Sequence, residues 1–360
     1  MKATGQLHDL GQSLWLDNIT RELLTSGTLQ RYIDELSVTG LTSNPTIFDH
    51  AITHSSVYDE DIRRLVKLGH SGEALFFELA LEDLTQAADT FAPVYELTAG
   101  IDGWVSLEVS PMLAHDAKST VAEAKALHRK ARRSNMFIKI PGTKEGAVAI
   151  EEVIFSGVPV NVTLLFSREH YLNAANAYMR GLERRIAAGL CPEVHSVASL
   201  FISRWDKATT EKAPDSLRNK LGIAIGRQTY KAYRDLLDSD RWQRLAHHGA
   251  RPQRLLFAST GTKDPDASDV LYIEALAAPN TVNTMPEKTL LAFADHGQVN
   301  GTLPRDGGDT GEVLAEFAKA GIDLDSLAVA LQEDGASSFD ASWQDLLNSI
   351  ELKSKSIKGI

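Results

Sequence analysis

The sequence contains little cysteine, no long apolar runs and fewer basic than acidic residues. Each of these features argues against one class of protein. Cys191 is the one cysteine in 360 residues, so an intramolecular disulfide is excluded and no oxidising compartment is indicated. No run approaches the roughly 18 apolar residues of a membrane helix. The first residues also lack the apolar core of a secretory signal. We therefore expect a cytoplasmic protein without a membrane partner.

The charge balance is acidic, with 37 Lys and Arg against 48 Asp and Glu and a formal net charge of −11. Proteins that bind long polyanions usually carry a basic face, so we expect no nucleic-acid partner. The acidic balance does not exclude a small phosphorylated ligand, which needs only a few local basic residues. His50, His54, His247 and His248 lack a third ligand at a recognisable spacing, so no metal site is expected.

Eight short apolar or β-branched runs alternate with segments of helix length, an order that is typical of α/β proteins. Parallel strands need crossover helices, and eight such units over about 280 residues match a closed barrel. We therefore predict a TIM-type (β/α)8 barrel. An open doubly wound sheet is the alternative, although no G-x-G-x-x-G follows the first strand. The predicted strands are Ser13–Ile19, Val38–Asn44, Gly103–Val109, Asn135–Pro141, Val158–Phe166, His195–Ile202, Arg254–Ser259 and Thr281–Met285.

Several segments between these strands have the composition of helices. Leu113–Arg133 is rich in Ala and Lys and contains no proline or glycine. Ser167–Ala188 begins with Ser167 as a predicted N-cap. Asp215–Leu237 follows a proline, and a short helix is expected to begin at Pro286.

The C-terminal part of the chain is predicted to be a helical appendage. Residues 301–311 are rich in Gly, Asp, Thr and Pro and indicate a loop. We therefore divide the chain into a barrel domain at residues 1–297 and an extension at 298–360 that packs on the barrel. The extension is predicted to contain the helices Glu312–Ala320, Leu324–Glu333 and Ser342–Lys353, with Lys353–Ile360 as a frayed tail.

Polar side chains interrupt the predicted strands on one parity only. Strands of a parallel barrel are usually continuous hydrophobic runs, and their side chains alternate between two faces. In Asn135–Pro141, for example, apolar residues alternate with Lys139. We expect the apolar parity to face the outer helices and the polar parity to point into the barrel near its carboxyl ends. The residues expected to converge there are Asp17, Glu108, Lys139, Asn161, Thr163 and Ser199.

Lys139 is the member of this set whose burial most needs an explanation. An isolated buried charge is costly, so this lysine needs a carboxylate partner, a chemical role or both. A structural ion pair with Glu108 or Asp17 would account for a lone lysine, but the matching parity of the other polar residues favours a site. Burial disfavours the charged form of a lysine, and a neutral amine can attack a ketone to form an imine. Glu108 and Asp17 are suited to proton transfer, and Asn44 and Asn161 to holding hydroxyls.

Four segments resemble the signature motifs of the transaldolase family, and they follow the family's order. The resemblance extends from about Trp15 to Gly297, most of the chain. The strongest segment is K-I-P-G-T-x-E-G on a strand, whereas the T-S-N-P turn alone is weak. The segments are Gly40–Phe48 with the T-S-N-P turn, Phe137–Gly146 around Lys139, Val160–Ser167 and Ser196–Asp206.

The resemblance implies that Lys139 forms a Schiff base with a ketose donor. Asp17 would be the acid/base that cleaves and remakes the carbon–carbon bond, and Glu108 would act through a water held by Thr163. The implied reaction moves dihydroxyacetone from sedoheptulose 7-phosphate to glyceraldehyde 3-phosphate, giving erythrose 4-phosphate and fructose 6-phosphate in the non-oxidative pentose phosphate pathway. No cofactor is implied, because the lysine is the electron sink. The residues implied to bind substrate are Asn44, Asn161, Ser199, Phe201 and Arg204.

One departure from the family pattern follows the seventh strand. Many members have a second phosphate-binding arginine there, whereas this chain has none in Ala258–Pro265. Lys263, with the backbone and hydroxyls around Ser259, is the expected replacement, and a solvated lysine on a turn is the alternative. A simple aldolase of the same fold and a non-catalytic sugar-phosphate binder remain rival functions. A monomer and a homodimer both remain open.

Overall fold

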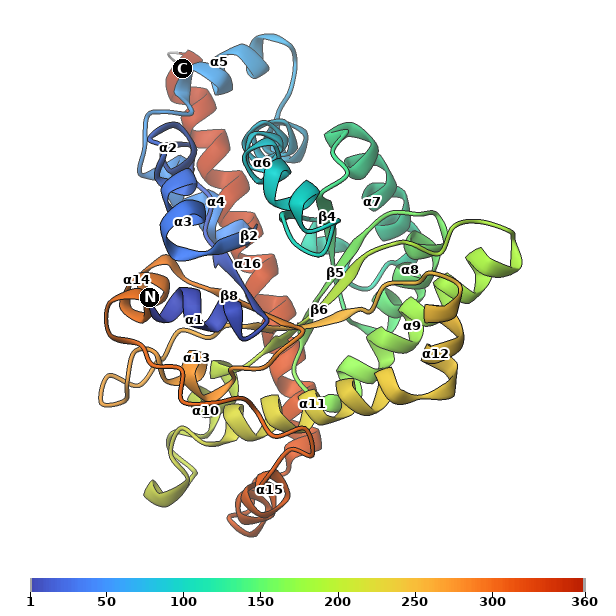
Figure 1. The fold of residues 1–360 in the computed structure, drawn as a ribbon. Coiled ribbons are helices and arrows are strands. Elements are labelled where there is room, and N and C mark those ends of the chain that lie inside the picture. The colour runs from blue at the N-terminus through green and yellow to red at the C-terminus, as the bar shows by residue number, and fades with distance from the viewer. Residues whose placement is uncertain (1, 359–360) are drawn as a thin grey trace.

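The computed structural model describes residues 2–358, which fold around eight parallel strands that close into a barrel (Figure 1). Each strand pairs with the next in sequence, and β8 returns to β1. The predicted (β/α)8 fold is confirmed, and apart from Gln12 the observed strands lie inside the predicted ranges. The strands are β1 (Gln12–Asp17), β2 (Val38–Thr42), β3 (Trp104–Glu108), β4 (Met136–Pro141), β5 (Val160–Leu165), β6 (Ser196–Phe201), β7 (Arg254–Ala258) and β8 (Thr281–Met285).

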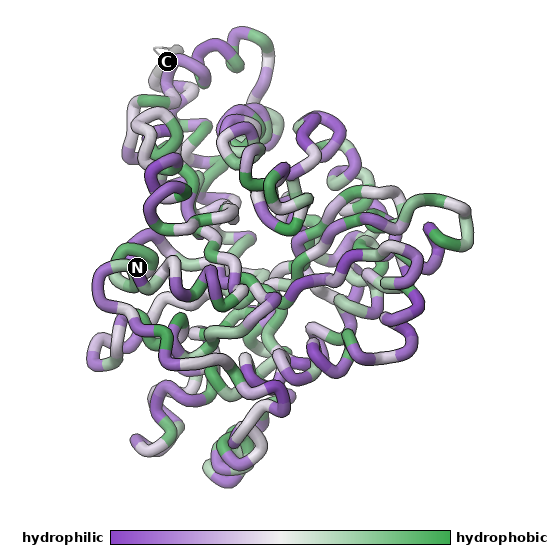
Figure 2. The backbone as a smooth tube through the Cα atoms, in the orientation of Figure 1, coloured by the Kyte–Doolittle hydropathy of each residue, from purple (hydrophilic) through white to green (hydrophobic). Residues whose placement is uncertain are grey.

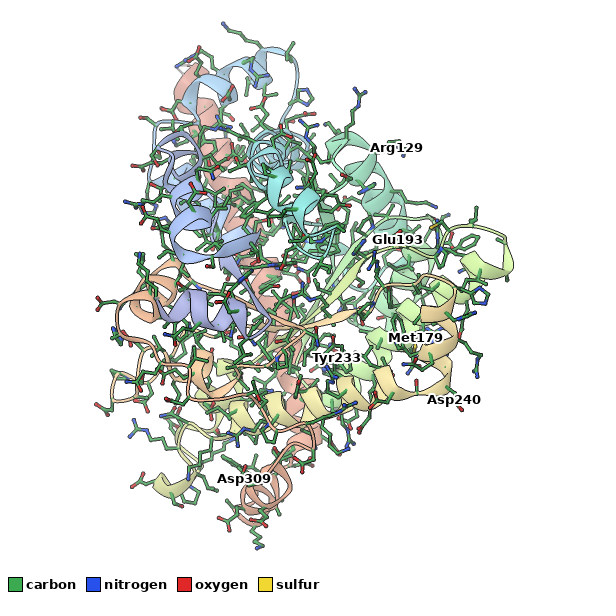
Figure 3. The ribbon with its side chains drawn as sticks, viewed as in Figure 1. Arg129, Met179, Glu193, Tyr233, Asp240 and Asp309 are labelled. Carbon is green, nitrogen blue, oxygen red and sulfur yellow. The ribbon has the colours of Figure 1, made fainter. Side chains whose placement is uncertain are left out.

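Helices surround the strands, and their outer turns are largely hydrophilic (Figure 2). Side chains fill the space between strands and helices, whereas Arg129 at the end of α7 points outward (Figure 3). The helices up to β8 are α1 (Ala3–Asp9), α2 (Arg21–Thr25), α3 (Thr28–Leu36), α4 (Pro45–Thr53), α5 (Asp59–Lys67), α6 (Gly72–Leu97), α7 (Ala117–Ala131), α8 (Lys144–Phe155), α9 (Arg168–Ala187), α10 (Ser203–Thr209), α11 (Leu221–Asp238), α12 (Asp240–His247) and α13 (Leu271–Ala275). After β8 come α14 (Glu287–His296), α15 (Thr310–Lys319) and α16 (Leu324–Lys358), and two 3-10 turns are η1 (Pro111–Leu113) and η2 (Asp215–Leu217).

Aromatic side chains fill the amino-terminal half of the barrel interior. Trp104 stacks on Phe137 with ring centroids 4.0 Å apart, and the Trp15 ring lies 6.1 Å from Phe137. Gly40 admits this cluster, because a Cβ at that position would lie 2.8 Å from the Trp15 ring. The smaller polar side chains of the strands are therefore left to the carboxyl-terminal half.

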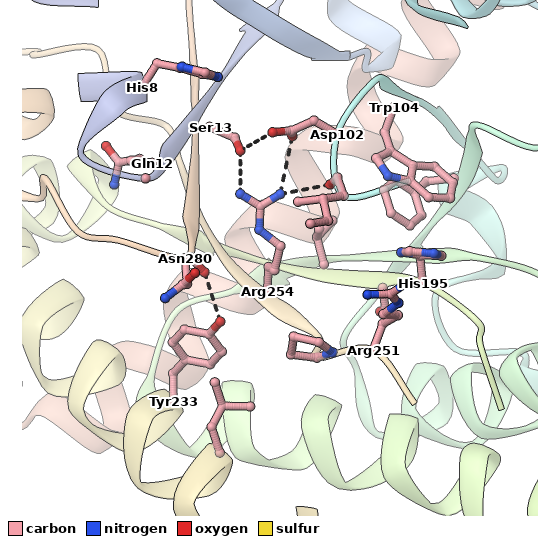
Figure 4. Close-up of a pocket in the computed structure, with 17 residues that line it drawn as sticks. His8, Gln12, Ser13, Asp102, Trp104, His195, Tyr233, Arg251, Arg254 and Asn280 are labelled. Carbon is pink, nitrogen blue, oxygen red and sulfur yellow. Dashed lines mark hydrogen bonds and ion pairs between the residues drawn. The ribbon is translucent and has the colours of Figure 1, made fainter. Parts of the chain in front are cut away.

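A buried ion pair closes the amino-terminal end of the barrel (Figure 4). Arg254 lies 3.3 Å from Asp102 and donates to the carbonyl of Thr281 at 2.9 Å. Ser13 joins this network by donating to Asp102 at 2.5 Å and accepting from Arg254. A cavity of about 380 Å³ lies beside it, but the charges of Arg254 and Asp102 neutralise each other. This end of the barrel therefore has a structural role, as is usual in the fold.

Two predicted helix starts were wrong, one because the observed cap comes from another helix and one because the cap lies three residues further along the chain. The segment predicted as Asp215–Leu237 forms the turn η2, and α11 begins only at Leu221. The start is set by Asp206 of α10, whose carboxylate accepts from the amides of Leu221 and Gly222 at 2.9 and 3.1 Å. Likewise α7 begins four residues after Leu113, where Asp116 accepts from the Ser119 amide. In contrast, Ser167 caps α9 as predicted.

The extension contains one long helix where two were predicted. Residues 324–358 form the continuous α16, so the predicted gap between the helices Leu324–Glu333 and Ser342–Lys353 was wrong. The predicted frayed tail was wrong up to residue 358, and residues 359 and 360 lie outside the described residues. Gly335 does not end the helix; it allows close packing, since a Cβ there would lie 3.1 Å from Leu164. Helix α16 runs most of the length of the molecule and packs on α4, α5, α6 and β5 (Figure 1). No helix among residues 2–358 is long and apolar enough to cross a membrane.

Candidate active site

A cavity of about 490 Å³ opens at the carboxyl ends of the strands, where catalytic sites of this fold lie. Its volume is in the range of small-molecule sites. Every strand except β3 contributes a lining residue, either from within the strand or from the segment that follows it. Nine residues predicted for the site line this cavity, namely Asp17, Asn44, Lys139, Thr163, Ser199, Phe201, Arg204, Ser259 and Lys263.

Lys139 lies at the base of this cavity next to Glu108. The two residues are direct neighbours in the β3–β4 register, and the lysine Nζ lies 3.0 Å from Glu108 Oε2. Nζ also donates to the Ser43 carbonyl at 3.1 Å. Both residues are only 5% exposed, yet Lys139 still lines the cavity. The lysine is therefore paired with a carboxylate but not sealed from a ligand.

Two buried oxygens beside this pair are left without partners. Glu108 Oε1 and Thr163 Oγ1 form no hydrogen bond to any part of the chain that the structure describes. Buried polar atoms are normally satisfied, and exceptions are common at functional sites. These two acceptors lie on the strands that flank Lys139, one on β3 and the other on β5.

Asp17 is the second carboxyl of the site. Its Oδ1 accepts from Thr42 at 2.8 Å, and the Thr42 hydroxyl is 2.8 Å from that of Thr284. These hydroxyls fix the orientation of the Asp17 carboxyl at the end of β1. Because its other oxygen is not used by Thr42, Asp17 can exchange a proton with a ligand in the cavity that it lines.

Burial raises the pKa of Asp17 and of Glu108, because desolvation disfavours a charged carboxylate. The positive charge of Lys139 acts in the opposite direction on both groups, and the negative charge of Asp17 raises the pKa of Glu108 further. A carboxyl with a raised pKa holds a proton more readily, so it can act as an acid as well as a base. The site therefore combines one primary amine with two carboxyls suited to moving protons.

The amide side chains predicted to bind hydroxyls lie at different depths. Asn44 lines the cavity, and its Oδ1 caps α4 by accepting from the Ile47 amide at 3.1 Å, which leaves Nδ2 as a donor. Asn161 is fully buried and does not line the cavity. It accepts from Ser199 at 2.8 Å and donates to Ser106 at 3.1 Å. Ser199 therefore lies between the cavity and Asn161.

Three cations gather at one end of the cavity. Arg204 and Lys207 are one turn apart on α10, and Lys263 follows β7. Burial lowers the pKa of Lys263, and repulsion from Arg204 and Lys207 lowers it further. An anion between the three would relieve this repulsion. Ser259, in the left-handed region at φ +54°, also lines this end, with its hydroxyl 2.9 Å from that of Ser203.

Sequence reasoning missed several residues that line the cavity, and three of them, Thr42, Lys207 and Phe339, bear on its chemistry. Thr42 continues the polar parity of its strand and lies inside the T-S-N-P segment, so a signal was present. Lys207 is three residues after Arg204 on a helix, a spacing that puts both on one face. Phe339 lies in α16, and its ring centroid is 5.7 Å from Lys139 Nζ. No local pattern connected a residue of the extension with a strand two hundred residues earlier.

Clusters that could hold a metal ion are absent: within residues 2–358 no three His, Cys, Asp or Glu side chains are suitably grouped. A buried amine that lines a cavity beside two carboxyl groups has the components that imine formation with a carbonyl compound requires.

Comparison with known proteins identifies the relatives of this chain. The family model described as Transaldolase/Fructose-6-phosphate aldolase matches residues 14–350. A protein named "Transaldolase" from Saccharopolyspora erythraea is 45% identical over 351 residues, which cover 96% of this chain and 95% of that protein. A "Transaldolase" from Parafrankia sp. (strain EAN1pec) is 45% identical over 360 residues, covering 97% of each chain. "Transaldolase 2" from Nostoc punctiforme is 40% identical over 369 residues and also covers 97% of each.

Proposed function

The chain belongs to the Transaldolase/Fructose-6-phosphate aldolase family and its activity is that of a transaldolase, a transferase; we propose that it performs the transfer through a Schiff base on Lys139. The observation that carries this proposal is the contact between Lys139 and Glu108, 3.0 Å long and open to a cavity that Asp17 also lines. The amine, a proton-accepting carboxylate and a second acid/base group are the parts that imine chemistry requires.

In the proposed reaction the Lys139 amine attacks the ketone carbon of a ketose phosphate. Glu108 handles the protons of carbinolamine formation and loss of water through a water molecule that hydrogen-bonds to Thr163. Both oxygens that would hold this water, Glu108 Oε1 and Thr163 Oγ1, are buried and have no other partner among the described residues. The protonated imine then accepts the electron pair of the carbon–carbon bond between the α and β carbons, so that the α carbon becomes part of an enamine.

Asp17 is the proposed acid/base for the carbon–carbon step. It takes the proton of the hydroxyl next to the breaking bond, so that an aldehyde leaves and a three-carbon enamine stays on Lys139. In the reverse direction Asp17 protonates the oxygen of the acceptor aldehyde as the new bond forms. The raised pKa of Asp17 suits both directions.

The three-carbon unit and the phosphate occupy different parts of the cavity in this proposal. Asn44 and Ser199 hold hydroxyls near Lys139, and Asn161 positions Ser199. Arg204, Lys207 and Lys263 bind the phosphate. We propose sedoheptulose 7-phosphate as donor and glyceraldehyde 3-phosphate as acceptor, with erythrose 4-phosphate and fructose 6-phosphate as products. Phe201, packed 5.3 Å from Phe166, and Ser259 would form part of the wall around the sugar chain.

Several broader statements belong to the same proposal. The chain would act in the cytoplasm in the non-oxidative pentose phosphate pathway, without a cofactor, nucleic acid or membrane, and as a monomer or a homodimer. Residues 1–297 would form the catalytic barrel, and residues 298–360 the extension that packs on it.

Two other functions compete with this proposal. A fructose-6-phosphate-type aldolase would use the same lysine but release free dihydroxyacetone. A non-catalytic binder would need the cations around Arg204 but not the buried amine of Lys139. The burial of Lys139 and Glu108 argues against the binder, because a buried ion pair adds little stability over apolar residues.

Borohydride reduction tests the proposal directly. Fructose 6-phosphate and borohydride should add the mass of a reduced three-carbon unit or of the reduced whole sugar phosphate, and peptide mapping should locate it on Lys139. Lys139→Met should give no adduct, whereas Lys144→Met, which removes an exposed lysine on α8, should give the wild-type adduct. Absence of any adduct in the wild-type protein would favour the binder.

A further inference from the structure

Helix α16 lies across the mouth of the barrel and contacts barrel helices at several residues. Trp343 packs between Phe76 and Phe77 of α6, with ring centroids 5.0 and 5.7 Å apart. Ser342 accepts from Thr46 of α4 at 2.8 Å. These anchors come from barrel helices on one side of the cavity, so α16 is held in place as a fixed wall.

A second set of contacts joins α16 to the strands of the catalytic lysine and threonine. Gln332 donates to the carbonyl of Leu164 in β5 at 2.8 Å and to that of Gly142, just after β4, at 3.2 Å. Leu164 has a left-handed backbone, φ +58°, at an irregularity in the β5–β6 pairing. Gly335 packs against Leu164 and Phe166 one turn further along. The face of α16 that contains Gln332 and Gly335 therefore contacts the rim directly above Lys139 and Thr163.

Phe339 is the next residue on this face, and it reaches the site. Residues 332, 335 and 339 are spaced by three and four, which places them on one side of a helix. Of the described residues of α16, Phe339 alone lines the catalytic cavity. Its side chain is nearly buried, and Lys139 Nζ lies over its ring, 5.7 Å from the centroid. An aromatic face attracts a cation and offers no hydrogen bond to water.

We propose that Phe339 is a specificity-determining residue that keeps solvent water away from the carbon of the three-carbon enamine on Lys139, so that the enamine is passed to an aldehyde and is not protonated and released as free dihydroxyacetone. The inference rests on the proposed function, because it requires the imine on Lys139. It assigns a role in the reaction to the C-terminal helix.

The two fates of the intermediate differ in where water and protons go. In transfer, the enamine carbon bonds to the acceptor aldehyde carbon, and the aldehyde oxygen takes a proton from Asp17. In release, the enamine carbon takes a proton instead, one water adds to the imine carbon, and the carbon–nitrogen bond then breaks. That path yields dihydroxyacetone and the free Lys139 amine. The water that hydrolyses the imine is the one held by Glu108 and Thr163 in the proposed function. Release therefore depends on the proton that the enamine carbon takes before the acceptor binds, in the space that the Phe339 ring borders.

The partition between these fates is the quantity to measure. With fructose 6-phosphate as donor and erythrose 4-phosphate as acceptor, the ratio of dihydroxyacetone released to sedoheptulose 7-phosphate formed is independent of how much of the enzyme is folded. We expect Phe339→Ala to raise this ratio about tenfold, equal to ~1.4 kcal/mol of relative barrier, and Phe339→Leu to raise it less. Leu346→Ala, which removes a fully buried side chain of α16 that does not line the cavity, is the matched control and should leave the ratio unchanged.

The measured ratio tests the role of Phe339, and it does so independently of the test of the Schiff base on Lys139. An increased ratio in Phe339→Ala alone supports it. An unchanged ratio in Phe339→Ala, or the same increase in Leu346→Ala, would overturn it and leave α16 with a structural role. Borohydride trapping on Lys139 in the wild-type protein is read independently, so a failure of the Schiff-base proposal is seen as a missing adduct and not as a changed ratio.

Discussion

Exchanging each carboxyl for its amide should separate the proton transfers of imine formation from those of carbon–carbon cleavage. Glu108→Gln keeps the shape of the side chain beside Lys139 but removes the base that serves the water step. Asp17→Asn keeps an acceptor for Thr42 but removes the acid/base at the bond that breaks. If the two residues divide the chemistry as proposed, the two variants lose activity at different steps.

The expected magnitudes follow from the geometry of the two groups. A positioned general acid/base typically contributes 10²–10⁴-fold, so each variant should lose at least about 100-fold in kcat. Glu108→Gln also neutralises one partner of a buried pair 3.0 Å long, which should cost about 3–5 kcal/mol of folding stability. Asp17 has its hydrogen bond with Thr42 and, within residues 2–358, no ion pair closer than 4.0 Å, so Asp17→Asn should cost less.

Borohydride trapping with fructose 6-phosphate resolves the two steps. Asp17→Asn should still form an adduct, and its mass should be that of the intact sugar phosphate because the carbon–carbon bond is not cleaved. Glu108→Gln should form an adduct slowly, with a trapping rate reduced in proportion to kcat. The division of roles would be refuted if Asp17→Asn gave only the three-carbon adduct, or if Glu108→Gln were trapped at the wild-type rate.

Two further predictions concern the phosphate end and a carboxyl pair away from the site. In steady-state assays, Lys263→Ala should raise KM for fructose 6-phosphate about tenfold. Lys263→Arg should keep KM within about threefold of wild type, because an arginine restores the cation. An unchanged KM for the alanine variant would assign Lys263 to a solvated turn. Burial, and then Glu73, raise the pKa of Glu123 to about 7. A raised carboxyl pKa favours folding below the unfolded value of 4.5 and loses that contribution as pH rises through 7. Glu123→Gln should therefore gain a few degrees in Tm relative to wild type between pH 5 and pH 8 by thermal denaturation, and parallel pH profiles of the two proteins would contradict this.

Local pattern was sufficient where a structural feature depends on neighbours in sequence. The strands were predicted within a few residues because each is a short buried run whose alternation is visible in the chain. The cap of α9 was predicted because Ser167 satisfies an amide only three residues away. The start of α11 was missed because its cap, Asp206, is 15 residues upstream of Leu221 and belongs to another helix.

The candidate site divides in the same way. Lys139 and Glu108 could be placed on the inner face from parity, but their 3.0 Å contact depends on the register of β3 with β4. Asn161 has the expected parity, yet it is hydrogen-bonded to Ser106 and Ser199 below the cavity. Sequence parity determines which face of a strand a side chain lies on. Whether that side chain can contact a ligand depends on how many other side chains lie between it and the cavity.

By itself the sequence determined the order of strands and helices, the inward parity of the polar residues and the presence of an amine among them, because these depend on composition and on periods of two and 3.6 residues. The tertiary structure alone decided which end of the barrel is packed with aromatic rings and which is hollow, and it placed Phe339 over Lys139. These features join residues up to two hundred positions apart. Closing the barrel and laying α16 across it brings them together, and no local pattern along the chain encodes that approach.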